Sequence, residues 1–75
     1  MLQRLPVVSG RQARRVFEKA GWVFSRQRGS HMILNRPAMP FNLSVPDHRE
    51  VDRSLLRGLI RDAGMTVDEF VALLD

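Results

Sequence analysis

The sequence predicts an α+β domain in which two helices cover one face of a three-stranded antiparallel sheet, with a short helix at the C-terminus. Apolar residues recur at helical spacing near both ends of the chain. Between them lie three short runs rich in β-branched and aromatic residues, with connections too short for a crossover helix. Because the order is α-β-β-β-α and 75 residues suffice for one domain, we expect a two-layer architecture.

The first helix is expected to follow Ser9, a residue type that caps helix N-termini, and Gln12 three positions later completes a capping box. One face has the apolar spacing of a buried helix face, formed by Ala13, Val16, Phe17 and Ala20. Gly21 is expected to end this helix. We therefore assign residues 9–75 to a single domain and expect residues 1–8 to form a loose N-terminal extension.

Three strands are expected next, at residues 22–27, 31–35 and 41–45. Side chains of the second strand alternate between two faces, one of which carries His31, Ile33 and Asn35. The third strand alternates in the same way, with a shared face for Phe41, Leu43 and Val45. Two prolines make the connection between these two strands a loop, because proline cannot donate to a sheet ladder.

A second helix is expected at about residues 53–63, with Asp52 or Ser54 as its cap. Its buried face is expected to contain Leu55, Leu56, Leu59, Ile60 and Ala63. Gly64 is expected to end it. Thr66 and Glu69 then form a second capping box, which predicts the short C-terminal helix.

Basic residues are concentrated in the first 46 positions. This part carries eight arginine or lysine side chains against one acidic residue, residues 47–75 carry four against seven, and the whole chain has a net charge of +4. Arginine, which supplies eleven of the twelve basic side chains, binds phosphate through parallel hydrogen bonds and stacks on bases. We therefore expect the first part of the chain to face a polyanion.

Composition also restricts the class of protein. The chain has no cysteine, which rules out disulfides and thiolate metal sites and fits a reducing cytoplasm. No apolar run approaches the roughly 20 residues of a membrane span. The acidic residues near position 50 have only Glu18 as a possible partner in the first 46 residues, so we expect neither a metal site nor a cofactor.

Three stretches, "GWVFSRQRGSHMIL", "VPDH" and "LLRGLIRDAGMTVDEF", together resemble the HicA family, the small toxins of HicA–HicB toxin–antitoxin pairs. The resemblance covers residues 9–74, and its most diagnostic part is Gly29-Ser30-His31 after a basic hairpin arm. It implies a fold like the double-stranded RNA-binding domain, a ribonuclease that cleaves messenger RNA without a ribosome, and a HicB partner that blocks it. The catalytic histidine of the family corresponds to His31. The chain departs from the family at Arg53-Ser54, where Gly-Thr often opens the second helix.

RNA carries its own nucleophile, the ribose 2′-hydroxyl, so an enzyme needs only to remove its proton, neutralise the phosphate and protonate the leaving oxygen. His31 is the candidate base, because histidine exchanges protons near neutral pH. Arg26 and Arg28 are candidates to hold the phosphate, and Gly29 lets a phosphate approach closely. Ser30 either donates a hydrogen bond to a phosphate oxygen or shapes the turn. From the residues alone, an ordinary exposed strand position explains His31 better.

Arg36 and His48 are further candidates for contact with RNA. His48 follows Pro46-Asp47 in a loop and is either the complementary acid or a side chain that holds the loop by donating to a backbone carbonyl. Arg36 either binds phosphate or keeps its loop soluble. Trp22 and Phe24 are expected in the core rather than stacked on bases, because a small domain needs its few large apolar side chains there.

Two other functions are compatible with the sequence. A non-catalytic double-stranded RNA-binding module would share the fold, but such modules begin their last long helix with lysines, and residues 52–58 contain none. A domain that only binds another protein would use the uncovered sheet face or a strand edge. The expected partners are thus messenger RNA and a HicB-like antitoxin, and neither a membrane nor a small-molecule cofactor.

Overall fold

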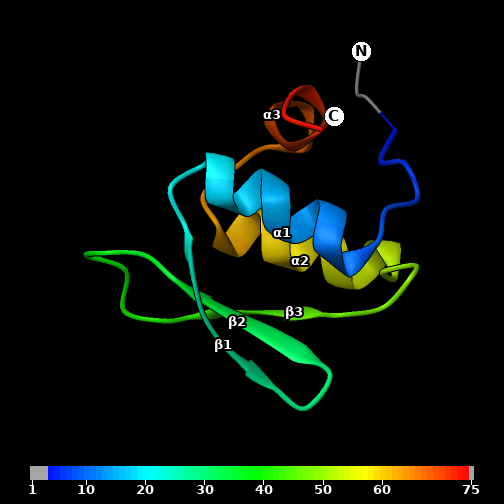
Figure 1. Cartoon of the computed structure of the whole chain (residues 1–75). Helices are drawn as coiled ribbons and strands as arrows, with labels where there is room; N and C mark the ends of the chain where they lie inside the picture. The colour runs from blue at the N-terminus through cyan, green and yellow to red at the C-terminus, as the bar shows by residue number, and fades with distance from the viewer. Residues whose placement is uncertain (1–3, 75) are drawn as a thin grey trace.

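The computed structural model describes residues 4–74 and contains six elements in the predicted order (Figure 1). They are α1 (Gly10–Lys19), β1 (Val23–Arg28), β2 (His31–Asn35), β3 (Leu43–Pro46), α2 (Arg53–Asp62) and α3 (Val67–Ala72). The strands form one antiparallel sheet in the order β1-β2-β3. The predicted α+β fold with a short C-terminal helix is therefore confirmed.

The two longer helices lie on the same side of the sheet (Figure 1). Both contact β3, and α1 also contacts β1, because each helix has an apolar face that must be buried against another layer. Within residues 4–74 no helix covers the other face of the sheet (Figure 1). This uncovered face is the surface on which the candidate site lies.

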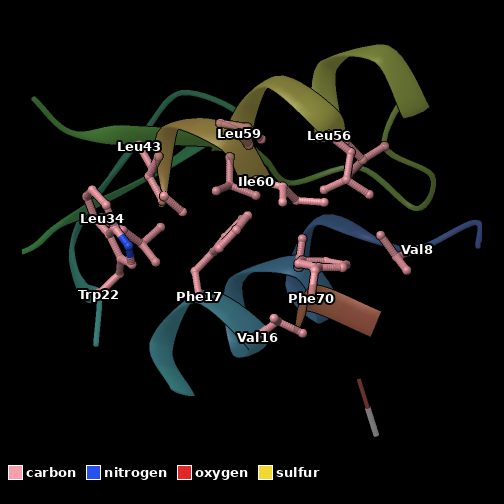
Figure 2. Packing of buried hydrophobic residues seen from close by; sticks show 14 of the residues in the cluster. Val8, Val16, Phe17, Trp22, Leu34, Leu43, Leu56, Leu59, Ile60 and Phe70 are labelled. Carbon is pink, nitrogen blue, oxygen red and sulfur yellow. The ribbon is translucent and has the colours of Figure 1, made fainter. Parts of the chain in front are cut away.

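Apolar side chains from the sheet and from all three helices fill the space between the layers (Figure 2). Leu34 and Leu43 come from the sheet, and Trp22 is buried among them, as expected of a core residue. Phe70 of α3 packs on Phe17 of α1 with ring centroids 5.5 Å apart, so the C-terminal helix is joined to the rest of the core. No helix between residues 4 and 74 has the length and apolar content needed to cross a lipid bilayer.

The helix starts follow the predicted capping signals. The Ser9 hydroxyl accepts a hydrogen bond from the Gln12 N–H, and the Gln12 side chain accepts one from the Ser9 N–H. Thr66 and Glu69 form the same reciprocal pair before α3. At α2, the Asp52 carboxylate accepts from a backbone N–H at 3.1 Å, which identifies Asp52 and not Ser54 as the cap.

The segment before α1 is anchored to the domain at Leu5 and Val8. Leu5 is fully buried, and its carbonyl accepts a 2.9 Å hydrogen bond from the Arg53 side chain. The Val8 carbonyl accepts another from the Val51 N–H, also at 2.9 Å. The described part of the extension that we expected to be loose is therefore held by burial and by two hydrogen bonds, while residues 1–3 lie outside the described residues.

Two apolar side chains lie outside the faces predicted for them. β3 begins at Leu43, so Phe41 belongs to the preceding loop, where its ring contacts Trp22 and 41% of its surface is exposed. Leu55 was expected on the buried face of α2 but is 46% exposed. The buried residues of α2 are Leu56, Leu59 and Ile60. Leu55 lies at the border of the apolar face that these residues form, where the helix turns toward solvent.

Candidate functional site

An irregularity in β1 determines which side chains the uncovered face carries. Phe24 is paired with Leu34 and Arg26 with Ile33, so two steps along β1 correspond to one step along β2. Ser25 is the extra residue of this β-bulge. Phe24 lies opposite a core residue, and a regular strand would put Arg26 on the same face. The bulge shifts the alternation by one residue and brings Arg26 to the uncovered face.

Arg28 and His31 are directly paired across the same hairpin. Residues paired across an antiparallel ladder point to the same side of the sheet, so Arg26 with Ile33 and Arg28 with His31 share the uncovered face. Together with two residues near β3, they line a hollow of about 410 Å³, formed by Arg26, Arg28, His31, Ile33, Asn42 and Ser44. The structure thus brings His31 and the two predicted arginines into one site.

The hollow is a shallow, positively charged surface with an apolar centre. Ile33 lies on the central strand and is only 7% exposed, whereas His31 and both arginines are exposed to solvent. Two guanidinium groups and no carboxylate are found among the described residues that line it. Such a surface attracts an anion, because no nearby acidic side chain neutralises the two arginines.

The turn between β1 and β2 holds His31 at the edge of this hollow. Gly29 has a φ of 60°, a left-handed conformation that favours glycine, and no atom lies near the position of a β-carbon. The Gln27 side chain donates to the Gly29 carbonyl at 3.2 Å. The Ser30 carbonyl accepts a 2.7 Å hydrogen bond from the Asp47 N–H, which ties the turn to the end of β3. Gly29 and Ser30 are exposed beside the hollow but do not line it.

The structure does not bring the other two predicted RNA contacts to this hollow. His48 is exposed in the loop after β3, and its backbone carbonyl accepts a 2.8 Å hydrogen bond from the Gly10 N–H at the start of α1. This bond is made by the backbone of His48 and not by its imidazole, so it does not test either role expected for the side chain. Arg36 lies in the loop between β2 and β3, beside Gly21, and lines a different surface depression with residues of α3.

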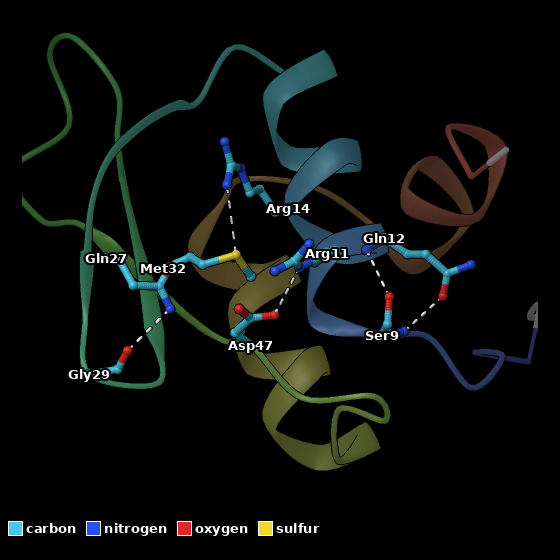
Figure 3. Close-up of polar contacts among 8 residues, drawn as sticks. All are labelled: Ser9, Arg11, Gln12, Arg14, Gln27, Gly29, Met32 and Asp47. Carbon is cyan, nitrogen blue, oxygen red and sulfur yellow. Dashed lines mark hydrogen bonds and ion pairs between the residues drawn. The ribbon is translucent and has the colours of Figure 1, made fainter.

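A second group of arginines lies on α1, on the side of the sheet that the helices cover (Figure 3). Arg11 pairs with Asp47 at 3.3 Å, and Arg14 pairs with Glu18 at 3.5 Å. The Arg14 guanidinium also stacks 3.9 Å above one face of the Phe24 ring, which is partly buried against the core. These arginines are partly neutralised, so the hollow around His31 is the stronger candidate for binding an anion.

Sequence reasoning missed three residues of the hollow. Ile33 was assigned to the face of His31 but given no role, and Asn42 and Ser44 were not singled out. The alternation of β3 contained the signal, since a buried Leu43 puts Asn42 and Ser44 on the opposite side. In residues 4–74 no three His, Asp or Glu side chains form a group that could hold a metal ion.

A comparison against protein-family models identifies the family of the chain. The model described as HicA toxin of bacterial toxin-antitoxin matches residues 10–65, well over half of the chain. The chain belongs to the HicA toxin family. As a HicA toxin, it is the toxin of a toxin–antitoxin system, so its partner is an antitoxin. A search of curated proteins finds no match to the chain.

The part of the chain that matches the HicA family contains every residue of the hollow. It includes α1, the whole sheet and α2, and it ends before α3. The buried N-terminal segment before α1 also lies outside it. The elements that hold His31 and its neighbours thus lie in the matched part of the chain, and the two flanking segments add buried side chains, Leu5 and Phe70, to the core.

Proposed function

We propose that this HicA toxin is an endoribonuclease that cleaves messenger RNA without a ribosome and that a HicB-like antitoxin inhibits it. The observation that supports this proposal is the position of His31 in a solvent-open hollow with two unneutralised arginines. An imidazole beside a phosphate-binding pair has the groups that RNA cleavage requires, because the substrate supplies the nucleophile itself. Membership of the HicA toxin family supports the same conclusion.

The proposed reaction uses the ribose 2′-hydroxyl next to the scissile phosphate. The His31 imidazole removes the 2′-hydroxyl proton, the 2′-oxygen forms a bond to phosphorus, and the bond from phosphorus to the 5′-oxygen breaks. The leaving 5′-oxygen takes a proton from water, to which the hollow is open, and the His31 imidazolium gives its proton to the hydroxide that this leaves. The products of this metal-free route are a 2′,3′-cyclic phosphate and a 5′-hydroxyl end, and His31 ends in the neutral form in which it began.

The two arginines stabilise the negative charge that increases on the phosphate as the 2′-oxygen attacks. Arg28 is the cross-strand partner of His31, and Arg26 lies one pair further along the ladder, so both guanidinium groups reach the same side of the sheet as the imidazole. Gly29 leaves space for the RNA backbone, since no atom lies within 4 Å of the position of a β-carbon there. Ser30 offers a hydroxyl donor beside this path.

The passive double-stranded RNA-binding module is the weaker alternative. Such a module needs cations at the start of its last long helix, facing phosphates across a groove. In this chain, the Asp52 carboxylate caps α2 and puts negative charge there. The Arg53 guanidinium is used in a hydrogen bond to the Leu5 carbonyl. The start of α2 is therefore poorly suited to bind a phosphate backbone.

The test is cleavage of a single-stranded RNA by the purified chain and by His31→Ala, with His48→Ala as the matched histidine control. We expect His31→Ala to lose about 100-fold or more in rate, the usual contribution of a general base. The His48→Ala variant should retain most activity. Thermal unfolding of each variant checks that the fold is kept. Equal cleavage by folded His31→Ala and by the parent would contradict the proposal.

The chemistry of the nucleophile has its own control. An RNA in which a single 2′-deoxy residue replaces the ribose at a mapped cleavage site should stay intact at that site. For the partner, saturation with the antitoxin should stop cleavage, because we expect it to cover the basic surface around His31. Undiminished cleavage in the saturated complex would rule out inhibition by occlusion of this surface.

A further inference from the structure

We propose that the β3 side of the hollow, formed by Asn42 and Ser44, receives a nucleobase of the RNA strand and that Asn42 determines which bases are accepted. This inference rests on the proposed ribonuclease function and deepens it, because it assigns base selection to residues that the cleavage step does not use. It depends on how charged, apolar and neutral polar groups are distributed across the three strands.

Charged and neutral groups lie on opposite sides of the hollow. Arg26 on β1 and Ser44 on β3 are both paired with Ile33 on the central strand, so these three residues form one row across the sheet. Neighbouring strands are about 4.8 Å apart, which separates the outer two backbones by roughly 10 Å. A nucleotide whose phosphate lies over the arginines can therefore reach the neutral β3 side with its base.

The centre of the hollow suits the flat face of a base. Ile33 points to the uncovered side of the sheet, yet it is 7% exposed, which leaves a small apolar floor between the two polar sides. An aliphatic side chain offers dispersion contacts to a planar ring but no hydrogen bond to a phosphate. The floor thus favours a base at this position and leaves the phosphate to the arginines.

Asn42 is held in place by its neighbours while its own amide is available. The ring of Phe41 packs against Trp22 with centroids 6.2 Å apart, and Leu43 is buried. Both sides of Asn42 are therefore fixed, although Asn42 itself is exposed and its side chain has no hydrogen-bond partner among residues 4–74. A carboxamide offers a donor and an acceptor together, the combination that pairs with the edges of bases.

The test measures binding to oligonucleotides that cannot be cleaved because every 2′-oxygen is methylated. Three probes, each made of a single base type (adenine, cytosine or uracil), are compared for the parent, Asn42→Asp and Asn42→Ala. The matched control is Asn35→Ala. Asn35 is exposed at the end of β2 opposite to His31 and does not line the hollow. The Asn35→Ala variant should leave the ranking of the three probes unchanged.

We expect the parent to prefer one probe and Asn42→Ala to reduce that preference by about 5- to 100-fold, as the loss of a good amide–base pair would. Asn42→Asp removes the donor and keeps the acceptors, so it should change the order of the probes and not only weaken binding. A parent that binds all three equally, or Asn42 variants that weaken all three by the same factor, would overturn the inference.

Cleavage sites mapped on a mixed-sequence RNA separate this inference from the proposed function. If cleavage depends on His31 and the Asn42 variants cut at the same sites as the parent, the ribonuclease stands and the inference is overturned. If the parent does not cleave but its ranking of the methylated probes depends on Asn42, the nucleobase site stands and the ribonuclease fails. A shifted set of sites in Asn42→Asp supports both.

Discussion

The first residue of α1, Gly10, and the last residue of β3, Pro46, meet with no room for a side chain between them. A β-carbon on Gly10 would overlap the carbonyl oxygen of Pro46 and lie 3.2 Å from the Asp47 α-carbon. The Gly10 N–H donates a 2.8 Å hydrogen bond to the His48 carbonyl at the same contact. Because the Asp47 N–H in turn bonds the Ser30 carbonyl, this contact connects α1 to the turn that carries His31.

Gly10→Ala should therefore be strongly destabilising. The atom that the new methyl group meets is backbone, which cannot turn aside, and overpacking of this kind costs about 1–3 kcal/mol. Gly58→Ala is the control, since the added methyl meets only the Arg61 side chain at 3.9 Å and a helix interior favours alanine over glycine by about 0.5–1 kcal/mol. Chemical denaturation should show the two substitutions changing the free energy of unfolding in opposite directions. A Gly10→Ala variant as stable as the parent would contradict the close contact.

Leu5→Ala should reveal that the N-terminal segment contributes to the core. Leu5 is fully buried, and removing a buried leucine costs about 2–5 kcal/mol. A domain of this size is stable by only about 4–11 kcal/mol, so the loss should be large in a thermal melt. Val7→Ala, at a side chain that is 55% exposed, should change the free energy of unfolding by about 0.5 kcal/mol or less. Similar melting temperatures for both variants would mean that the segment is not packed.

Removing single residues from β1 should show what the bulge does. Deleting Ser25 makes the strand regular and leaves both arginines paired with Ile33 and His31, so RNA binding should be kept. Deleting Gln27 also removes the bulge, but it puts Arg26 opposite Met32, on the core side. Only the second deletion should lower affinity for RNA, to the level of Arg26→Ala. Equal affinities for the two deletion variants, measured with both folded, would contradict the register.

Arg26→Ala and Arg28→Ala should each weaken RNA binding in a salt-dependent manner. For single-stranded nucleic acid, each phosphate contact that is lost lowers the slope of log affinity against log salt concentration by about 0.7. Arg57→Ala is the control, because Arg57 is an exposed arginine of α2 that does not line the hollow. Titrations between low and moderate salt should show the smaller slope only for the two β1 variants. An equal effect of Arg57→Ala would indicate attraction by net charge alone.

The candidate site was predicted in part. His31, Arg26 and Arg28 were named from the sequence and lie together in the hollow. Arg36 and His48 were named with them, yet they lie at other parts of the surface, because loop residues that are close in sequence to a site are not held there by any sheet register. Asn42 and Ser44 were missed, since only the pairing of β3 with β2 puts them beside Ile33.

The sequence by itself determined the order of the elements and the starts of the helices. The capping boxes at Ser9 and Thr66, the turn glycine at position 29 and the apolar periodicity act within a few residues, so their structural result does not depend on the rest of the chain. The tertiary structure decided the bulge at Ser25, the exposure of Leu55 and the burial of Leu5. These features depend on strand register and on competition for a limited core, which are properties of segments that meet only after the chain has folded.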